Sequence, residues 1–161
     1  MDEAGKKILS SLESRCARRE YCSRDILHKA ALAIEKVGAD VSAGELLSKL
    51  VEEGYVDDAR YAGAFAREKS GLTGWGPAKI RFFLSAKGIA RETIAAALAD
   101  TDPDRSSERL RKLLETKARA LKGDPDIKLK LLRFALGRGY EYDSVKEPVD
   151  SAVKALQEAE D

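Results

Sequence analysis

Lys87-Gly88-Ile89 closes a basic amphipathic segment in the middle of the chain, and Lys36-Val37-Gly38 and Arg138-Gly139-Tyr140 close similar segments before and after it. The three glycines lie 50 and 51 residues apart. A period of about fifty residues with helical patterning inside each unit is typical of a tandem repeat. Because units of this size are marginal alone, we expect them to stack on their neighbours and to present a binding surface.

The first repeat is predicted to contain three helices, because apolar residues recur at helical spacing between turn and capping residues. Ser42 and Glu45 form an S-x-x-E capping box that opens the third of them. The side chains expected to face inward are Ile8, Leu9, Leu12, Cys16, Ile26, Leu27, Ala30, Ala31, Ile34, Leu46, Leu47, Leu50 and Val51.

The second repeat is predicted to begin at Asp57 or Asp58, whose carboxylates suit a helix N-terminus. Its first helix is expected to stop at the glycine-rich turn Gly71-Leu72-Thr73-Gly74-Trp75-Gly76, and Pro77 to open the next helix. The buried stripe of that helix is predicted to be Ile80, Phe83 and Leu84. We interpret Trp75 as a plug between helices, with an exposed contact residue as the alternative.

The third repeat shows Asp-Pro pairs, Asp102-Pro103 and Asp124-Pro125, that suit helix starts. Pro148 predicts either a short turn before it or a bent last helix. The predicted fold class is therefore all-α, with about nine helices in three tandem three-helix repeats. Their expected boundaries are residues 1–54, 55–100 and 101–161.

Charge is uneven along a chain whose formal net charge is only +1. That balance argues against a protein that holds nucleic acid chiefly by bulk positive charge. Residues 105–138 carry eleven Lys or Arg against four acids, whereas residues 141–161 carry two against seven. The pattern indicates either a basic surface for an acidic partner or two solvated faces that attract each other.

No constellation of catalytic residues is found in the sequence. His28 is the single histidine, and neither a Ser-His-acid pattern nor an HExxH motif is present. Cys16 and Cys22 form too small a set for a zinc site or a disulfide framework. We therefore expect no catalytic residue, no metal and no cofactor. The sequence shows no secretory leader and no apolar run of about 18 residues, so we expect a cytoplasmic protein without a membrane partner.

Basic residues flank the second and third glycine turns and are expected to line one face, since stacked repeats display equivalent positions side by side. The alternative is that these are ordinary solvated cations. The residues are Lys79, Arg81, Lys87 and Arg91 in the second repeat, and Lys128, Lys130, Arg133 and Arg138 in the third.

Three segments follow one another in the middle of the chain: Glu53-Gly54-Tyr55-Val56-Asp57-Asp58-Ala59-Arg60-Tyr61-Ala62, then Gly74-Trp75-Gly76-Pro77-Ala78-Lys79-Ile80, then Lys87-Gly88-Ile89. Together they resemble the central signature of the RecX family, regulators of the RecA recombinase. Residues 17–27 and 132–140 resemble the family's first-repeat and third-repeat segments. The order and separation of these segments cover nearly the whole chain. The matching motif residues are Asp57, Asp58, Arg60, Tyr61, Gly76, Pro77 and Gly88.

The resemblance implies an elongated, curved array of the three repeats that binds RecA filaments on single-stranded DNA as a monomer. Binding would hinder filament growth, ATP hydrolysis and strand exchange, and so restrain recombination and the SOS response without chemistry of its own. The residues expected to pair with acidic RecA residues or nearby DNA phosphate are Arg60, Lys79, Arg81, Lys87, Arg133 and Arg138.

Two other classes of function remain open. Three-helix units with basic second helices also suit a direct DNA-binding module that acts without RecA, which steep salt dependence would reveal. A passive helical scaffold for another protein is the third reading, and an enzyme is the least favoured. Weak direct DNA contact beside RecA binding is compatible with the main reading.

Overall fold

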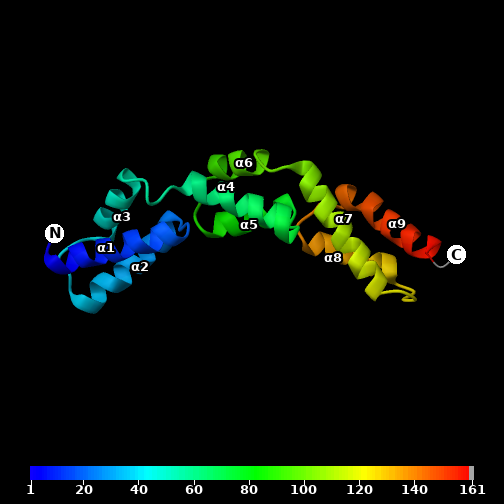
Figure 1. The fold of residues 1–161 in the computed structure, drawn as a ribbon, viewed down its shortest axis with the longest axis horizontal. Helices are drawn as coiled ribbons and strands as arrows, with labels where there is room; N and C mark the ends of the chain where they lie inside the picture. The colour runs from blue at the N-terminus through cyan, green and yellow to red at the C-terminus, as the bar shows by residue number, and fades with distance from the viewer. Residues whose placement is uncertain (160–161) are drawn as a thin grey trace. The chain divides into compact units, whose positions relative to one another are not determined.

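The computed structural model describes residues 1–159, and its regular secondary structure in that range is entirely helical (Figure 1). The predicted all-α class is confirmed, and the grouping of the helices is consistent with tandem three-helix repeats. None of the helices in this range is long and apolar enough to cross a bilayer. The elements are α1 (Glu3–Arg18), α2 (Ser23–Val37), α3 (Ala43–Glu52), α4 (Asp58–Glu68), a π-helical turn η1 (Lys69–Thr73), α5 (Pro77–Ala86), α6 (Arg91–Ala99), α7 (Pro103–Ala120), α8 (Ile127–Gly137) and α9 (Tyr142–Glu158).

The three glycines of the repeat occupy equivalent backbone positions. Gly38, Gly88 and Gly139 follow α2, α5 and α8 and have φ values of +67°, +79° and +96°. A left-handed residue after the last helical turn reverses the chain, and only glycine adopts it without steric cost. The glycine that recurs about every fifty residues in the sequence therefore ends a helix in the same way three times in the structure.

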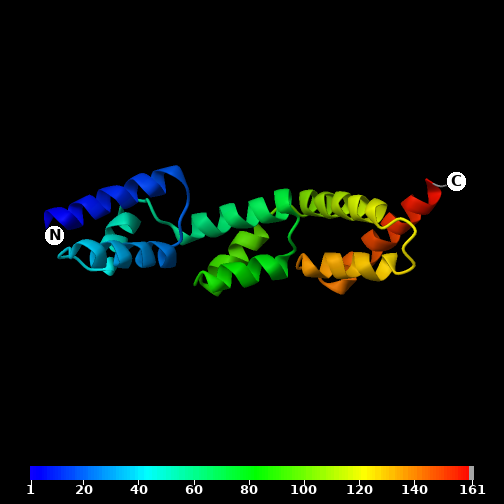
Figure 2. The ribbon, with the colours of Figure 1, turned by 90° about the horizontal axis from the view of Figure 1, so that it is seen from below.

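The chain forms two compact units, residues 1–62 with 85–94 and residues 63–84 with 95–161. This division passes through α4, α5 and α6, so the helices expected to form the second repeat contribute residues to both units. Figure 2 shows the chain turning back between α7 and α8 within the second unit. The repeat boundaries at residues 54 and 100 remain a prediction from the sequence.

The core of the first unit is built from α1, α2 and α3. Ile26 and Leu46 are fully buried, and Leu12 is 4% exposed. Burying one such side chain stabilises the fold by about 1.5–3 kcal/mol. Asp2 and Ser42 cap α1 and α3 by accepting hydrogen bonds from the backbone N–H groups of Gly5 and Glu45 at 2.8 and 3.1 Å. The other buried residues of this cluster are Ile8, Cys16, Ala30, Leu50 and Val56.

The core of the second unit lies between α7, α8 and α9. Leu114, Leu131 and Val149 are fully buried there. Asp102 caps α7 and Pro103 occupies its first turn, as predicted. Pro125 instead lies in the turn before α8, where Asp124 Oδ1 accepts a hydrogen bond from the Asp126 N–H at 2.8 Å.

Several predicted details of the helices are wrong. Val51 is 49% exposed and Leu27 is 37% exposed, because each lies at the edge of an apolar stripe that its neighbours already fill. Phe83, predicted to be buried, is 42% exposed. The helical chain continues past Gly71 through η1 to Thr73 before it leaves the helix at Gly74. The last helix, α9, is continuous through Pro148, so the alternative of a separate turn before the proline is wrong, while a bend at Pro148 stays a prediction.

Candidate partner-binding surface

The motif residues Asp57 and Asp58 hold helix starts. Asp57 Oδ1 accepts a hydrogen bond from the Arg60 N–H at 3.0 Å and so caps α4. Asp58 Oδ1 accepts one from the Ser23 N–H at 2.8 Å, at the start of α2. Tyr61 is half-buried, and burial raises its pKa. The two aspartates thus hydrogen-bond to backbone N–H groups of the protein, and Tyr61 packs within it, so these motif residues have structural roles.

Lys87, a predicted contact residue, pairs with a carboxylate of the first repeat. Its Nζ donates to Asp25 Oδ2 at 3.0 Å and to Oδ1 at 3.3 Å. The hydrogen bond to Asp25 raises the Lys87 pKa. Next to it, the Arg24 guanidinium donates to the Ala86 carbonyl at 2.8 Å, and Arg24 also packs over Gly88. Lys87 therefore helps to hold the second glycine turn to α2.

Arg60, another predicted contact residue, links the start of α4 to Glu20, which follows α1, and to Gly54, which follows α3. Its Nε donates to Glu20 Oε2 at 2.5 Å, and its Nη2 donates to the Gly54 carbonyl at 3.0 Å. Glu20 raises the Arg60 pKa through this hydrogen bond. The Arg60 side chain remains 45% exposed, so one edge of the guanidinium still faces solvent.

Arg138 joins the third glycine turn to the turn before α5. Its Nη1 donates to the Thr73 carbonyl at 3.1 Å, and its guanidinium lies 5.2 Å from the Phe134 ring centroid. Its carbonyl accepts a hydrogen bond from the Gly76 N–H at 2.6 Å. A Cβ on Gly76 would collide with the backbone of Gly139, so the close approach requires glycine there.

Lys79 belongs to a cluster of rings and cations in the second unit. Its Nζ lies 4.5 Å from the Trp75 ring centroid, and the Lys69 Nζ lies 4.8 Å from the same centroid. The Trp75 ring centroid is 4.9 Å from that of Phe83 and 6.1 Å from that of Phe65. Half-buried Trp75 thus packs between rings, as the plug interpretation predicts, and also holds two cations at the surface.

Arg81 and Arg133 are the two predicted contact residues whose charged groups face solvent. Both are exposed on α5 and α8, and no hydrogen bond or ion pair of either side chain occurs within residues 1–159. An exposed guanidinium keeps all of its donors for a carboxylate or a phosphate. These two residues are therefore the most available cations of the predicted set.

Phe82 was missed by the sequence analysis. It is 68% exposed beside Arg81, and its ring centroid lies 5.6 Å from that of Phe83. The signal was present, because Phe82 is two positions from Ile80 and so falls outside the i, i+3, i+4 stripe that a buried helix face requires.

The strongly basic segment 105–138 is in part neutralised locally. Lys128 Nζ lies 2.8 Å from Asp150 on α9, and Lys130 forms an ion pair with Asp124. Arg111 contacts both Glu108 and Glu115 along α7. Only the Lys128–Asp150 pair joins the basic segment to the acidic one, as the alternative of two attracting faces predicts; the other pairs lie within residues 105–138. Arg133 forms none of these pairs.

The cysteines lie inside the protein rather than in an open site. Cys16 and Cys22 are both buried, and burial raises the pKa of each thiol. His28 is exposed on α2. Within residues 1–159, no three His, Cys, Asp or Glu side chains come together in an arrangement suited to a metal ion.

Known proteins resemble this chain over most of its length. It is 34% identical over 130 residues to the regulatory protein RecX of Pseudomonas putida strain KT2440, covering 80% of both chains. It is 31% identical over 143 residues to the regulatory protein RecX of Escherichia coli strain K12/DH10B, covering 81% of this chain and 82% of that protein. The regulatory protein RecX of Clostridium botulinum strain Eklund 17B is 34% identical over 108 residues, and the match spans half of that protein.

Solved structures share the fold. The crystal structure of RecX from Lactobacillus salivarius aligns with a TM-score of 0.73 at 20% identity, covering 98% of this chain and 99% of that one. A second crystal structure of a regulatory protein RecX aligns with a TM-score of 0.76 at 22% identity, covering 92% of this chain and 72% of that one. The family models of the second and third three-helix domains of RecX match residues 57–98 and 104–147. The resemblance read from the sequence is confirmed, and the chain belongs to the RecX family.

Proposed function

We propose that this protein is a regulator that binds RecA filaments on single-stranded DNA and inhibits ATP hydrolysis, filament growth and strand exchange. The observation that carries the proposal is its membership of a family whose relatives are named regulatory protein RecX, at 31–34% identity over about four fifths of the chain. The protein acts in this proposal as a cytoplasmic monomer and performs no chemistry of its own.

The contact with the filament is assigned to two groups of residues. Arg81, Arg133 and Lys79 supply charge to acidic RecA side chains or to DNA phosphate, and Phe82 supplies apolar surface. Arg60, Lys87 and Arg138 contribute mainly by holding the glycine turns in place, since each already has a partner within the fold. Exposed edges of these three allow them a secondary contact.

Several contacts are needed because each one is weak. An exposed ion pair contributes up to about 1 kcal/mol, which is less than a factor of ten in affinity. Contacts from successive repeats to successive filament subunits add together, since the first contact raises the effective concentration of the next. A repeat protein on a repeating filament is suited to this mode of binding.

The rate of RecA ATP hydrolysis on single-stranded DNA tests the proposal. The protein is titrated in at levels too low to coat the DNA, and a parallel assay follows its binding to the same DNA without RecA. We expect hydrolysis to fall at these substoichiometric levels. Unchanged hydrolysis across the titration would contradict the proposal.

A direct DNA-binding module is the second candidate. The observation that favours it is Phe82, since an exposed ring beside an arginine is the arrangement on which single-stranded bases stack. The parallel assay of DNA binding without RecA separates the two functions, because direct DNA binding weakens steeply as the salt concentration rises and does not need RecA. Strong, salt-sensitive binding without RecA, together with unchanged hydrolysis, would favour the module.

A further inference from the structure

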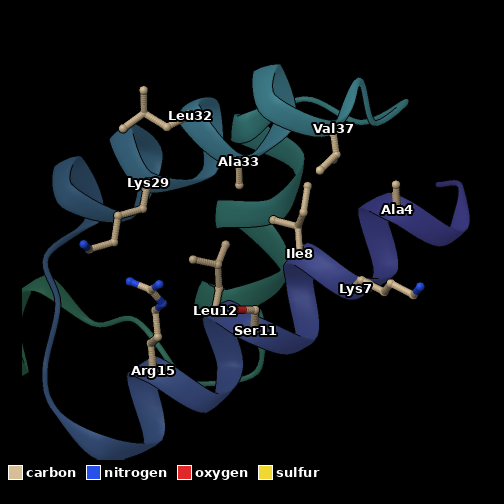
Figure 3. Close-up of a pocket in the computed structure, with 10 residues that line it drawn as sticks. All are labelled: Ala4, Lys7, Ile8, Ser11, Leu12, Arg15, Lys29, Leu32, Ala33 and Val37. Atoms are coloured by element: carbon tan, nitrogen blue, oxygen red, sulfur yellow. The ribbon is translucent and has the colours of Figure 1, made fainter.

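A groove between α1 and α2 is not used by the proposed function. It has a volume of about 620 Å³ and lies within the first unit (Figure 3). Ile8 and Leu12 of α1 and Ala33 of α2 form its apolar floor. Leu32 and Val37 of α2 also line it, although their side chains remain 56% and 57% exposed.

The exposed aliphatic side chains of the groove, Leu32 and Val37, are not part of the buried core. The core-facing positions of α2 are Ile26 and Ala30, which are fully buried. Leu32 and Val37 leave more than half of their surface in water, which is unfavourable unless another molecule covers them. They lie beside a concave apolar floor rather than singly on a convex face, so a complementary ridge can pack against them.

The rim of the groove is positively charged. Lys7, Arg15 and Lys29 line it, and its lining includes no aspartate or glutamate. Figure 3 shows Arg15 and Lys29 at one end of the groove and Lys7 towards the other. Neither Lys7 nor Arg15 forms an ion pair within residues 1–159, and Lys29 lies over the Tyr21 ring, 5.5 Å from its centroid. Like charges at both ends of an apolar groove favour an occupant with acidic flanks.

The dimensions of the groove suit a helix. The positions that α1 contributes run from Ala4 to Arg15, which corresponds to about 16 Å, or three helical turns, at 1.5 Å per residue. A helix bound in such a groove presents apolar anchors at i, i+3 or i+4, and i+7. We propose that the α1/α2 groove binds an amphipathic helix of a partner protein that carries an apolar stripe flanked by Asp and Glu.

A display selection tests this proposal with the full-length chain. The probe is a library of helical peptides of about fourteen residues in which apolar, acidic and basic positions vary. Selection on the wild-type protein is followed by counter-selection on the Leu32→Glu, Val37→Glu double variant. We expect the enriched peptides to share an apolar stripe at helical spacing and a negative net charge.

Fluorescence anisotropy of the enriched peptides then measures the role of each residue. Leu32→Glu and Arg15→Glu should each weaken binding about tenfold or more, because one removes an anchor and the other repels an acid. Leu129→Glu is the matched control, since Leu129 is 47% exposed on α8, outside the groove, and should leave the affinity unchanged. Circular dichroism and thermal unfolding confirm that the variants fold.

Three results would overturn the proposal. The first is a selection that enriches no sequence, or only basic ones. The second is peptide binding that Leu32→Glu and Arg15→Glu do not weaken. The third is binding of the wild-type chain to anionic lipid vesicles, but not to neutral ones, that the same substitutions abolish, because that would assign the groove to a membrane surface. The probe contains neither RecA nor DNA, so its outcome is independent of the function proposed above.

Discussion

The carboxylate of Asp58, in the first turn of α4, accepts a hydrogen bond from the backbone N–H of Ser23 at 2.8 Å and so caps α2. Its neighbour Asp57 caps α4 itself through the Arg60 N–H. Two adjacent acidic residues thus serve two helices from different repeats. An aspartate that caps a distant helix fixes tertiary structure as well as a helix start.

Asp58→Ala should lower the free energy of unfolding by about 1 kcal/mol, because the first turn of α2 loses its side-chain acceptor. Asp58→Asn should cost less, since an amide oxygen can accept the same hydrogen bond. Urea unfolding followed by circular dichroism measures both. Glu35→Ala, at an exposed position on α2, is the control. Equal stability of Asp58→Ala and wild type would show that water replaces the cap without loss.

Gly76→Ala should destabilise the second unit by about 2 kcal/mol or more, since overpacking against backbone leaves little room for relaxation. The added Cβ would lie 2.5 Å from the Gly139 carbonyl carbon and 2.6 Å from the Tyr140 nitrogen. Gly44→Ala is the matched control, because a Cβ at Gly44 in α3 meets no atom within 4 Å. Thermal unfolding should separate the two variants. If both were equally stable, the close contact of the two turns would be refuted.

Lys87→Met should reduce stability by less than about 1 kcal/mol, since the ion pair with Asp25 is partly exposed and screened. Asp25 raises the folded-state pKa of Lys87 above its ordinary value of 10.5. The stabilisation is therefore complete below pH 10.5 and is lost as the pH rises through the folded-state pKa. Urea unfolding between pH 7 and 11 measures this, with Lys36→Met as an exposed control. A stability difference that grew with pH would have the wrong sign.

The sequence predicted the local features of the fold well. The glycine turns at Gly38, Gly88 and Gly139, the Ser42 cap and the start of α5 at Pro77 all follow from signals a few residues long. Val51 and Phe83 were misplaced because both lie at the border of an apolar stripe. There, burial depends on which neighbouring element covers the helix, and helical periodicity does not contain that information.

The candidate surface was harder to predict because it depends on distant pairing. Lys87 contacts an acid 62 positions away, and Arg60 contacts one 40 positions away. Counting charges near the glycine turns identified basic residues but could not separate paired from unpaired ones. Arg81 and Arg133 emerge as available only when the partners of the other cations are known. Phe82 could have been found from its position outside the stripe.

Trp75→Ala and Phe82→Ala should separate an effect on stability from an effect on inhibition. Trp75 packs against Phe65 and Phe83, so its loss should destabilise the protein by about 2 kcal/mol. Phe82 is 68% exposed, and its loss should change stability by less than about 0.5 kcal/mol while weakening inhibition of RecA. Thermal unfolding and the ATPase titration measure the two effects. Tyr142→Ala, at a 50% exposed ring on α9, is the control, and an equal loss of inhibition there would remove Phe82 from the contact.

Arg81→Glu combined with Arg133→Glu should raise the protein concentration needed for half-inhibition of RecA about tenfold. Each reversal replaces an attraction of up to about 1 kcal/mol with a repulsion, and 1.4 kcal/mol corresponds to a factor of ten. Stability should stay near that of wild type, since neither side chain has a polar partner within residues 1–159. Lys146→Glu with Lys154→Glu changes the net charge equally at exposed positions of α9 and should leave inhibition unchanged. Equal losses in the two double variants would mean that the filament responds to total charge, and the assignment of Arg81 and Arg133 would fail.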